Sequence, residues 1–209
     1  METSAWLAYV VIIILSYLAG SVPSGVVLTA LFTDKDVRRQ GSGNIGATNV
    51  ARVAGLRLGL LTLALDLLKG GLPVFLAGRF VPGPAEIAMM AAALAAVGGH
   101  LFPIYFGCRG GGKGVATAAG AFLAAVPLAF LAAVGVFVLV AGITRRVSAG
   151  SLSAAIALPV LVWLFSAQPV FFAGACVISW LVVLRHKDNI VRLAAGTEPV
   201  FSSKRQGRP

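Results

Sequence analysis

Long apolar segments constrain this chain more than any other feature of its sequence. Seven can be distinguished, at residues 5–31, 54–78, 85–106, 114–126, 127–144, 151–167 and 169–184. About 20 apolar residues span the hydrocarbon core of a bilayer. Only 11% of the residues are charged, whereas a soluble domain carries about 25%. The sequence therefore predicts an all-α, polytopic membrane protein with a single membrane domain over residues 1–209.

The basic residues indicate how these segments are oriented. All of the 17 Lys and Arg residues except Lys69 and Arg79 fall in three loops, 33–57, 107–113 and 145–150, or in the tail, 185–209. Cytoplasmic loops collect Lys and Arg, so we expect an external N-terminus, a cytoplasmic tail and an odd number of spans. Seven transmembrane helices, some short or broken, satisfy this rule. Five satisfy it if residues 114–144 and 151–184 each form one span.

The stretch GSGNIGATNVAR, residues 41–52, is the first segment that can carry chemistry. Glycines permit positive φ and close backbone approach, so successive N–H groups can point into one anion-binding concavity. A helix from about Ile45 would place the anion at its N-terminus. Thr48 and Arg52 share a face of that helix, and Ser42, Asn44 and Asn49 add short polar groups. A glycine-rich turn between spans is the alternative.

The three glycines of this stretch also match G-x-G-x-x-G, the dinucleotide-binding pattern. That pattern requires a β-strand before the glycines and an acidic residue about 20 positions later. The preceding TDKDVRRQ has no strand character, and Asp66 lies inside a membrane segment. The sequence therefore does not indicate a dinucleotide site.

A second glycine-rich loop, FGCRGGGKGVAT, spans residues 106–117. Gly107 to Lys113 nearly matches the phosphate-binding P-loop, but Gly114 stands where a hydroxyl is needed and no strand precedes it. What remains is a glycine cradle with Lys113 as a point charge. We interpret it as a second anion site, the alternative being a basic loop at the membrane surface.

Polar residues elsewhere give weaker indications. His186, Asn189 and Arg192 recur three residues apart and would share one side of a helix; a basic helix meeting anionic lipid is the alternative. Asp66 and Lys69 lie inside a membrane segment, where they can pair or serve a function. We expect His100 to be packed and hydrogen-bonded, and Pro23, in GSVPSG, to break the first helix.

Several classes of enzyme are disfavoured by the scarcity of reactive groups. The seven carboxylates show no metal-ligand spacing, which argues against a Mg²⁺-dependent phosphotransferase. There is no His-x₄-Asp pair and no G-x-S-x-G elbow. We expect the two cysteines to be unpaired and packed. Transfer between two phosphate-bearing substrates, at least one of them a lipid, and anion transport both suit the loops that remain.

Together these segments resemble the bacterial acyl-phosphate:glycerol-3-phosphate acyltransferases. The resemblance runs in order through GSVPSG, GSGNIGATNVAR, DLLKGG, GHLFPIYFGCRGGGKGVAT, RRVSAGSLSA and RHKDNIVRLAAGTE, which is nearly the whole chain. One departure is VSAGSLSA, where the family places serines directly after the valine. This leaves the alignment of Ser148, Ser151 and Ser153 open.

The resemblance implies a seven-helix enzyme of the bacterial inner membrane with a cytoplasm-facing site. It implies an acyl phosphate donor, a glycerol 3-phosphate acceptor, no metal, no cofactor and no nucleic acid. The implied product is lysophosphatidic acid, and the reaction is the first step of phospholipid synthesis. The resemblance is compatible with a monomer. A thioester donor and an anion transporter are the alternatives. The implied catalytic residues are Ser42, Arg52, Lys113, His186 and Asn189; the implied substrate-binding residues are Gly41, Gly43, Asn44, Gly46, Thr48, Asn49, Gly111, Gly112 and Gly114.

Overall fold

The computed structural model describes residues 3–201, and within that range the chain is helical and contains no β-strand. Residues 202–209 of the expected tail lie outside it. The helices are α1 (Thr3–Ser21), α2 (Ser24–Phe32), α3 (Ala47–Ala54), α4 (Leu56–Phe80), α5 (Ala85–Leu101), the 3₁₀ turn η1 (Ile104–Phe106), α6 (Val115–Ala125), α7 (Pro127–Thr144), α8 (Val147–Ser166), α9 (Pro169–Arg185) and α10 (Lys187–Ala194). Helices α7 and α9 each begin at a proline, which is pre-organised for the first helical position.

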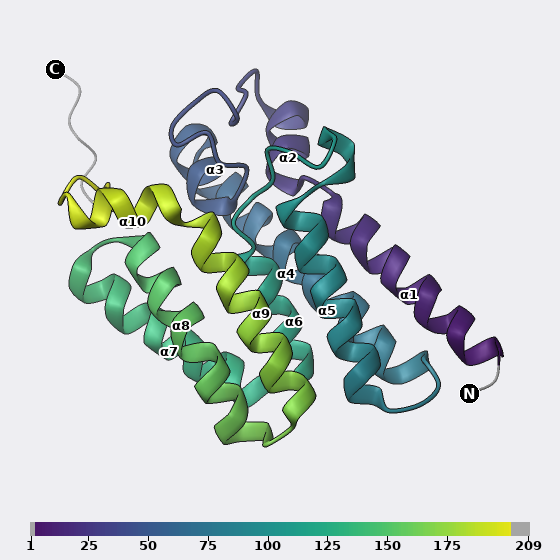
Figure 1. Ribbon diagram of the computed structural model, residues 1–209. Coiled ribbons are helices and arrows are strands. Elements are labelled where there is room, and N and C mark those ends of the chain that lie inside the picture. The colour runs from purple at the N-terminus through teal and green to yellow at the C-terminus, as the bar shows by residue number, and fades with distance from the viewer. Residues whose placement is uncertain (1–2, 202–209) are drawn as a thin grey trace, which may run out of the picture.

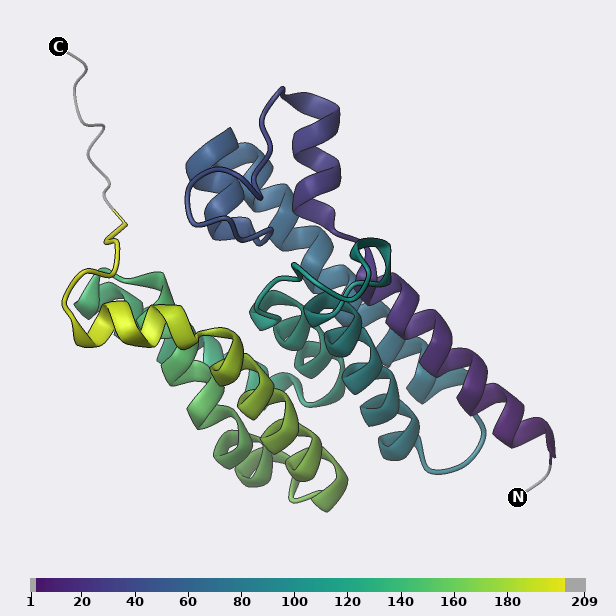
Figure 2. The ribbon, with the colours of Figure 1, turned by 45° about the horizontal axis from the view of Figure 1, so that its top comes forward.

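The long helices pack in two groups that meet along α9. Helices α1, α4, α5 and α6 form one group, α7, α8 and α9 form the other, and α9 also packs on α5 and α6 (Figures 1 and 2). The short helices α2, α3 and α10 and the loops before α3 and α6 gather at one end of the molecule, opposite the N-terminus (Figure 1). The candidate residues of the sequence therefore converge at this α10 end.

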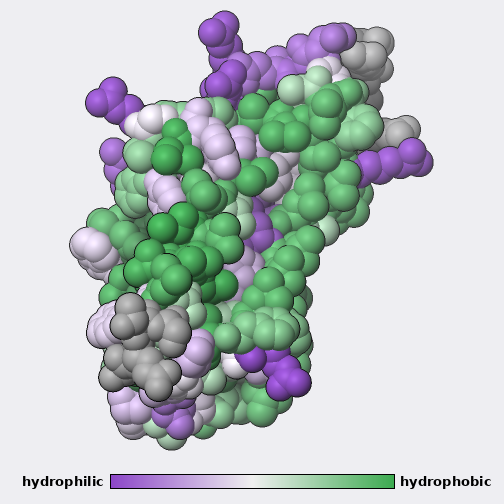
Figure 3. Space-filling view, turned by 90° about the vertical axis from the view of Figure 1, so that its right-hand side faces the viewer, coloured by the Kyte–Doolittle hydropathy of each residue, from purple (hydrophilic) through white to green (hydrophobic). Residues whose placement is uncertain are grey.

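The flanks of the molecule are apolar, as expected of an integral membrane protein. Figure 3 shows hydrophobic side chains covering one flank, with hydrophilic ones gathered toward the ends. Helices α4, α7, α8 and the segment Ala85–Phe106 are long and apolar enough to cross a membrane. Up to six spans result if the bent pairs α1–α2 and α9–α10 each count as one, and α6 is shorter, at 11 residues. The polytopic all-α class is confirmed, and the count of seven spans stays a prediction.

The expected break in the first apolar segment is present. Helix α1 ends at Ser21, α2 begins at Ser24, and the two bend by 43°. The break frees the Val22 carbonyl, which accepts a hydrogen bond of 2.8 Å from Lys69 Nζ. The same Nζ lies 2.7 Å from Asp66 Oδ1, which confirms the pairing of these residues. A polar group exposed by a helix break inside a membrane protein is thus satisfied by protein.

Glycines allow α4 and α6 to cross closely. A Cβ at Gly70 would meet the Thr117 carbonyl oxygen, and a Cβ at Gly120 would meet that of Leu67. Small residues at such crossings let helix backbones approach within the bilayer. The crossing fixes the first turns of α6, and hence the end of the loop before it, against α4.

The cysteines are free, but the expectation that they are packed was wrong. Both Cys108 and Cys176 are exposed. Cys108 lies in the loop before α6 at φ +60°. Cys176 lies on α9 one helical turn from Phe172 and Trp180, whose side chains are also exposed. It therefore belongs to the apolar flank, whereas Cys108 belongs to the α10 end.

Candidate active site

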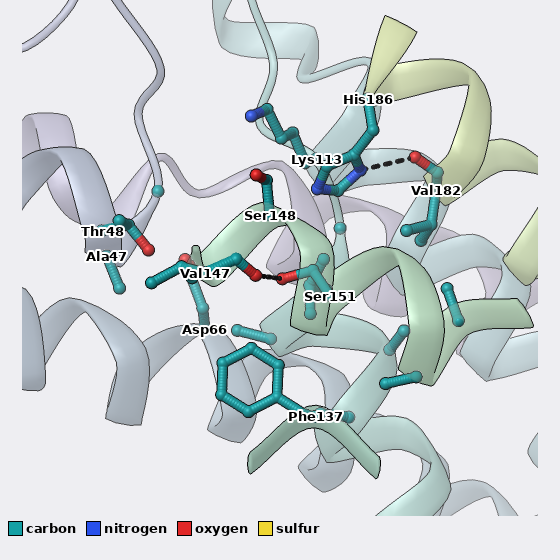
Figure 4. Close-up of a pocket in the computed structure, with 18 of the residues that line it drawn as sticks. Ala47, Thr48, Asp66, Lys113, Phe137, Val147, Ser148, Ser151, Val182 and His186 are labelled. Atoms are coloured by element: carbon teal, nitrogen blue, oxygen red, sulfur yellow. Dashed lines mark hydrogen bonds between the residues drawn. The ribbon is translucent and has the colours of Figure 1, made fainter. Parts of the chain in front are cut away.

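A cavity of about 820 Å³ extends from the α10 end into the space between the two groups of helices. Figure 4 shows Lys113, Ser148 and His186 on one side of it and Phe137 on the other. The polar residues that line it include Ser42, Asn44, Thr48, Arg52, Lys113, Ser148, His186, Asn189, Arg192 and Glu198. The apolar residues include Leu63, Leu67, Ala118, Phe122, Phe130, Val134, Phe137, Leu158 and Ile178. The cavity thus joins a charged mouth to a hydrocarbon-like interior.

The first loop (residues 33–46) is folded around the side chain of Asn49, on α3. Asn49 Oδ1 accepts a 2.9 Å hydrogen bond from the backbone N–H of Ser42. Asn49 Nδ2 donates to the carbonyls of Val37 (2.9 Å), Gln40 (3.1 Å) and Asn44 (2.9 Å). Gly41, at φ +62°, lies so close that a Cβ there would meet Asn49 Oδ1. The Asn49 amide therefore shapes the loop, and both of its N–H groups are already used.

Helix α3 begins where the first loop ends, two residues later than the expected Ile45. The N–H of Gly46 donates to Asn44 Oδ1 at 2.9 Å, which leads the chain into the helix at Ala47. Thr48 and Arg52, one turn apart on α3, both line the cavity. The N-terminal N–H groups of a helix favour a bound anion, and Arg52 adds a full positive charge beside them.

The second loop (residues 107–114) is held against the end of α5. The N–H of Gly112 donates to the His100 carbonyl at 3.1 Å. A Cβ at Gly112 would meet the His100 ring, and a Cβ at Gly111 would meet the Leu101 carbonyl oxygen. Gly114, at φ +82°, turns the chain into α6. Glycine is required at these positions because the backbone of the loop touches the helix end directly.

The Lys113 ammonium points from the second loop toward α10, where it donates a hydrogen bond to Asn189 Oδ1. Burial lowers the pKa of Lys113; Glu198 opposes this shift, and the cationic neighbours Arg192 and Arg52 add to it. Three cationic side chains from different elements thus converge on one mouth. They supply the charge that a phosphate dianion would need there.

Glu198, which the sequence analysis did not select, connects the elements around Lys113. Its Oε1 accepts hydrogen bonds of 2.6 Å from Ser148 Oγ and from Asn189 Nδ2. Its Oε2 accepts a hydrogen bond of 2.7 Å from Arg192 Nε. Burial raises the pKa of Glu198, but these three donors outweigh it and hold the pKa below its ordinary value. The carboxylate therefore orients the Asn189 amide, so that the amide oxygen faces Lys113.

His186 lies at the junction of α9 and α10 and faces the cavity. Its Nδ1 is 2.8 Å from the Val182 carbonyl (Figure 4). Because a carbonyl only accepts, Nδ1 carries the proton and Nε2 keeps its lone pair. Burial lowers the pKa of His186 to about 4, with the Lys113 charge adding to the effect. The imidazole is therefore neutral at pH 7.

The inner wall of the cavity carries two polar groups from membrane helices. Asp66 Oδ1 and His100 Nδ1 lie 3.9 Å apart, and both are buried. Asp66 Oδ1 is paired with Lys69 Nζ, whereas His100 Nδ1 has no hydrogen-bond partner among the described residues. The expectation that His100 is packed is met, but its Nδ1 is not hydrogen-bonded. Ser148 and Ser151 of α8 also line the cavity, whereas Ser153 is not among its lining residues.

The structure brings the candidate residues of the sequence to one place. Gly43 and Gly111 line a neighbouring polar pocket of about 240 Å³, and Gly112 lies against His100 of α5. The cavity itself is lined by Gly41, Ser42, Asn44, Gly46, Thr48, Asn49, Arg52, Lys113, Gly114, His186 and Asn189. Their catalytic and binding roles stay predictions. The residue that sequence reasoning missed is Glu198. Asp66, Ser148, Ser151 and Arg192, which the sequence indicated without an assigned site role, also line the cavity.

Fold and site together define a class of protein: an integral membrane enzyme whose cavity suits a phosphate group attached to a hydrocarbon chain. The chain belongs to the glycerol-3-phosphate acyltransferase family, whose model matches residues 10–196. A glycerol-3-phosphate acyltransferase of Syntrophotalea carbinolica is 47% identical, covering 94% of this chain and 99% of the relative. One of Myxococcus xanthus is 48% identical, covering 91% and 98%.

Solved structures agree with the family. The crystal structure of PlsY (YgiH), an integral membrane glycerol 3-phosphate acyltransferase, in its glycerol 3-phosphate form superposes with a TM-score of 0.87. It is 36% identical and covers 93% of this chain and 96% of its own. The lysophosphatidic acid form of that protein gives a TM-score of 0.84 at 35% identity. Family and fold therefore favour an enzyme over the anion transporter.

Proposed function

We propose that the protein transfers the acyl group of an acyl phosphate to the 1-hydroxyl of glycerol 3-phosphate, giving lysophosphatidic acid and inorganic phosphate. The observation that carries this proposal is the cavity, which joins a cationic mouth to an interior of Phe122, Phe130 and Phe137. An acyl phosphate has the same two parts, a dianionic head and a hydrocarbon chain. The reaction is the first step of phospholipid synthesis.

The location of the reaction follows from charge. The α10 end carries the basic loops, and basic loops face the cytoplasm. The relatives named above are bacterial enzymes, so we place the protein in the bacterial inner membrane with its site on the cytoplasmic side. Glycerol 3-phosphate would enter from the cytoplasm, and the acyl chain would remain at membrane depth.

The main task of the site is to hold two dianions close together. Arg52 on α3 and Lys113 in the second loop both line the cavity and supply positive charge from two different elements. Holding two reactants in register can contribute about 7–11 kcal/mol to lowering the barrier. Ser42 and Asn189 add hydrogen-bonding groups between these charges. The N–H groups at the start of α3 would stabilise the oxyanion that develops on the acyl carbonyl.

In the reaction, the hydroxyl oxygen of glycerol 3-phosphate attacks the acyl carbon. The bond between that carbon and the bridging phosphate oxygen breaks, and inorganic phosphate leaves with the electron pair. His186 Nε2 accepts a hydrogen bond from the attacking hydroxyl and orients it. Because its pKa is about 4, His186 is a weak base, and the hydroxyl proton ends on the leaving phosphate, which departs as HPO₄²⁻.

The donor and the role of Lys113 are tested by phosphate release from purified full-length protein. We expect release only when acyl phosphate and glycerol 3-phosphate are both present, and we expect Lys113→Ala to lower kcat/KM about 10²–10³-fold. Arg57→Gln, an exposed cation of α4, is the matched control. Equal turnover of an acyl thioester, or release that Lys113→Ala leaves unchanged, would contradict the proposal.

The role of His186 has its own test. General-base catalysis contributes about 10²–10⁴-fold, whereas an orienting hydrogen bond contributes less. We expect His186→Asn, which can still accept a hydrogen bond, to retain more activity than His186→Ala. A loss of about 10²-fold or more in both variants would instead assign the proton transfer to His186.

A further inference from the structure

The side chain of Arg185, the last residue of α9, is hydrogen-bonded to the backbone of the second loop. Its Nε donates to the Gly112 carbonyl at 3.1 Å, and its Nη2 donates to the Gly111 carbonyl at 2.5 Å. Its Cζ lies 5.9 Å from the centre of the Phe102 ring, just beyond the end of α5. The guanidinium is thus fixed by two charge-assisted hydrogen bonds and one aromatic face.

The two carbonyls depend on this side chain. Among the described residues no backbone N–H donates to Gly111 O or Gly112 O. On its other side the same segment is bound to α5, because the N–H of Gly112 donates to the His100 carbonyl. The residues directly before Lys113 are therefore held between α5 and α9, and both glycines are buried.

We propose that Arg185 is a positioning residue that sets the place of Lys113 by holding the backbone immediately before it. The Lys113 ammonium is held separately, by Asn189 on α10. Arg185 ends α9, and α10 follows after His186. The junction between α9 and α10 therefore holds both the backbone before Lys113 and the ammonium group of Lys113. The catalytic consequence rests on the role given to Lys113 in the proposed function, but the hold on the loop does not.

A competing role for Arg185 is direct binding of a substrate phosphate, because it also lines the 240 Å³ pocket. The two roles differ in how they combine with the loss of Lys113. A residue that acts through Lys113 has nothing left to do once the lysine is removed. A residue that binds phosphate itself loses its contribution in either background, because independent contributions add.

The first arm of the test follows the loop without reference to catalysis. Folded full-length protein is treated with trypsin, and cleavage after Lys113 is measured by mass spectrometry for wild type, Arg185→Gln, Arg185→Lys and the control Arg57→Gln. We expect cleavage at Lys113 to rise about tenfold or more in Arg185→Gln, because two hydrogen bonds to a charged group are lost. Arg185→Lys should be intermediate and the control unchanged, with cleavage elsewhere and the melting temperature near wild type.

The second arm is a double-mutant cycle on kcat/KM. We expect Arg185→Gln to cost about 10–10²-fold in the wild-type background, since a displacement of about 1 Å can cost 10²-fold. In the Lys113→Ala background it should cost less than about threefold. If Lys113→Ala turns over too slowly to measure, Lys113→Gln, which also lacks the charge, replaces it, and the cost of Arg185→Gln should again fall below that in wild type.

Unchanged cleavage after Lys113 in Arg185→Gln would overturn the inference, as would a full, additive loss in the Lys113 variants. Wild-type protein that releases no phosphate would refute the proposed function instead. In that case the proteolysis arm would still decide whether Arg185 holds the loop.

Discussion

The first and second loops both present a backbone cradle to the same cavity, but they are held in different ways. The first loop closes on Asn49, a side chain of the helix that directly follows it. The second loop is held by a carbonyl of α5 on one side and by Arg185, more than 70 residues along the chain, on the other. The hydrogen bonds that shape the first loop come from one local stretch of chain, whereas those of the second come from distant membrane helices.

Because of this difference, the loss of one supporting side chain should affect the two loops differently. Loss of Asn49 removes all four hydrogen bonds that tie residues 37–44 to α3, so the first loop should fail as a unit. Loss of one support of the second loop leaves the other in place, so its effects should be graded. One contact connects the two regions: Arg38 Cζ of the first loop lies 5.5 Å from the centre of the ring of Phe106, which directly precedes the second loop.

The largest effect is expected for Asn49→Ala. It removes four hydrogen bonds and leaves backbone groups without partners, so we expect kcat/KM for phosphate release to fall about 10³-fold. Trypsin cleavage after Arg38 should rise in parallel. Gln40→Ala is the control, because it keeps the Gln40 carbonyl and removes only an exposed side chain. Activity of Asn49→Ala within tenfold of wild type would show that the loop does not depend on this amide.

A smaller effect is expected for Gly112→Ala. The added Cβ would meet the His100 ring, so the second loop must shift, and we expect kcat/KM to fall about 10²-fold. Gly98→Ala is the matched control, since it adds the same group to α5 where nothing lies within 4 Å. If the two variants behaved alike, the close contact between the second loop and α5 would have no functional weight.

Glu198→Gln should cost about tenfold in kcat/KM, because hydrogen bonds to the charged carboxylate are weakened while the side chain keeps its shape. Ser148→Ala, which keeps the carboxylate, should cost less. The folded-state pKa of Glu198 is lowered, so its stabilisation is complete above the ordinary value and is lost as pH falls through the lowered one. Unfolding of wild type and Glu198→Gln followed from pH 7 to pH 3 should therefore converge at acid pH.

The smallest effect is a displacement of the pH profile. Burial lowers the pKa of Lys113, so its charge is lost at a lower pH than in an ordinary lysine, and kcat/KM should fall as pH rises through that value. Lys113→Arg places a guanidinium there, which keeps its charge, and should move the alkaline limb upward. An unchanged alkaline limb in Lys113→Arg would assign it to another group.

Much of the fold could be predicted from local sequence. Apolar runs bounded by Pro127 and Pro169 located α7 and α9 because proline marks a helix start. The break at Pro23 and the pairing of Asp66 with Lys69 also depend on neighbours in sequence. The first loop could be recognised for the same reason, since Asn49 lies within the motif that it organises.

The rest depended on contacts that no local pattern contains. Ser148 and Glu198 meet across 50 residues, and Arg185 reaches Gly111 across 74. In the sequence, Arg185 was one basic residue of the tail and Glu198 one carboxylate among seven. One signal was present for Glu198: a single acidic residue near the end of a basic tail requires a partner if it is buried.

The two cysteines give the molecule a built-in reporter of its orientation. A charged, membrane-impermeant maleimide needs water around the thiol, which the α10 end offers at Cys108 and the apolar flank of α9 withholds at Cys176. The unmodified chain should therefore take up one label, from one side of a sealed vesicle only. Because Cys108 stands five residues before Lys113, the labelled side is also the side on which the cavity opens.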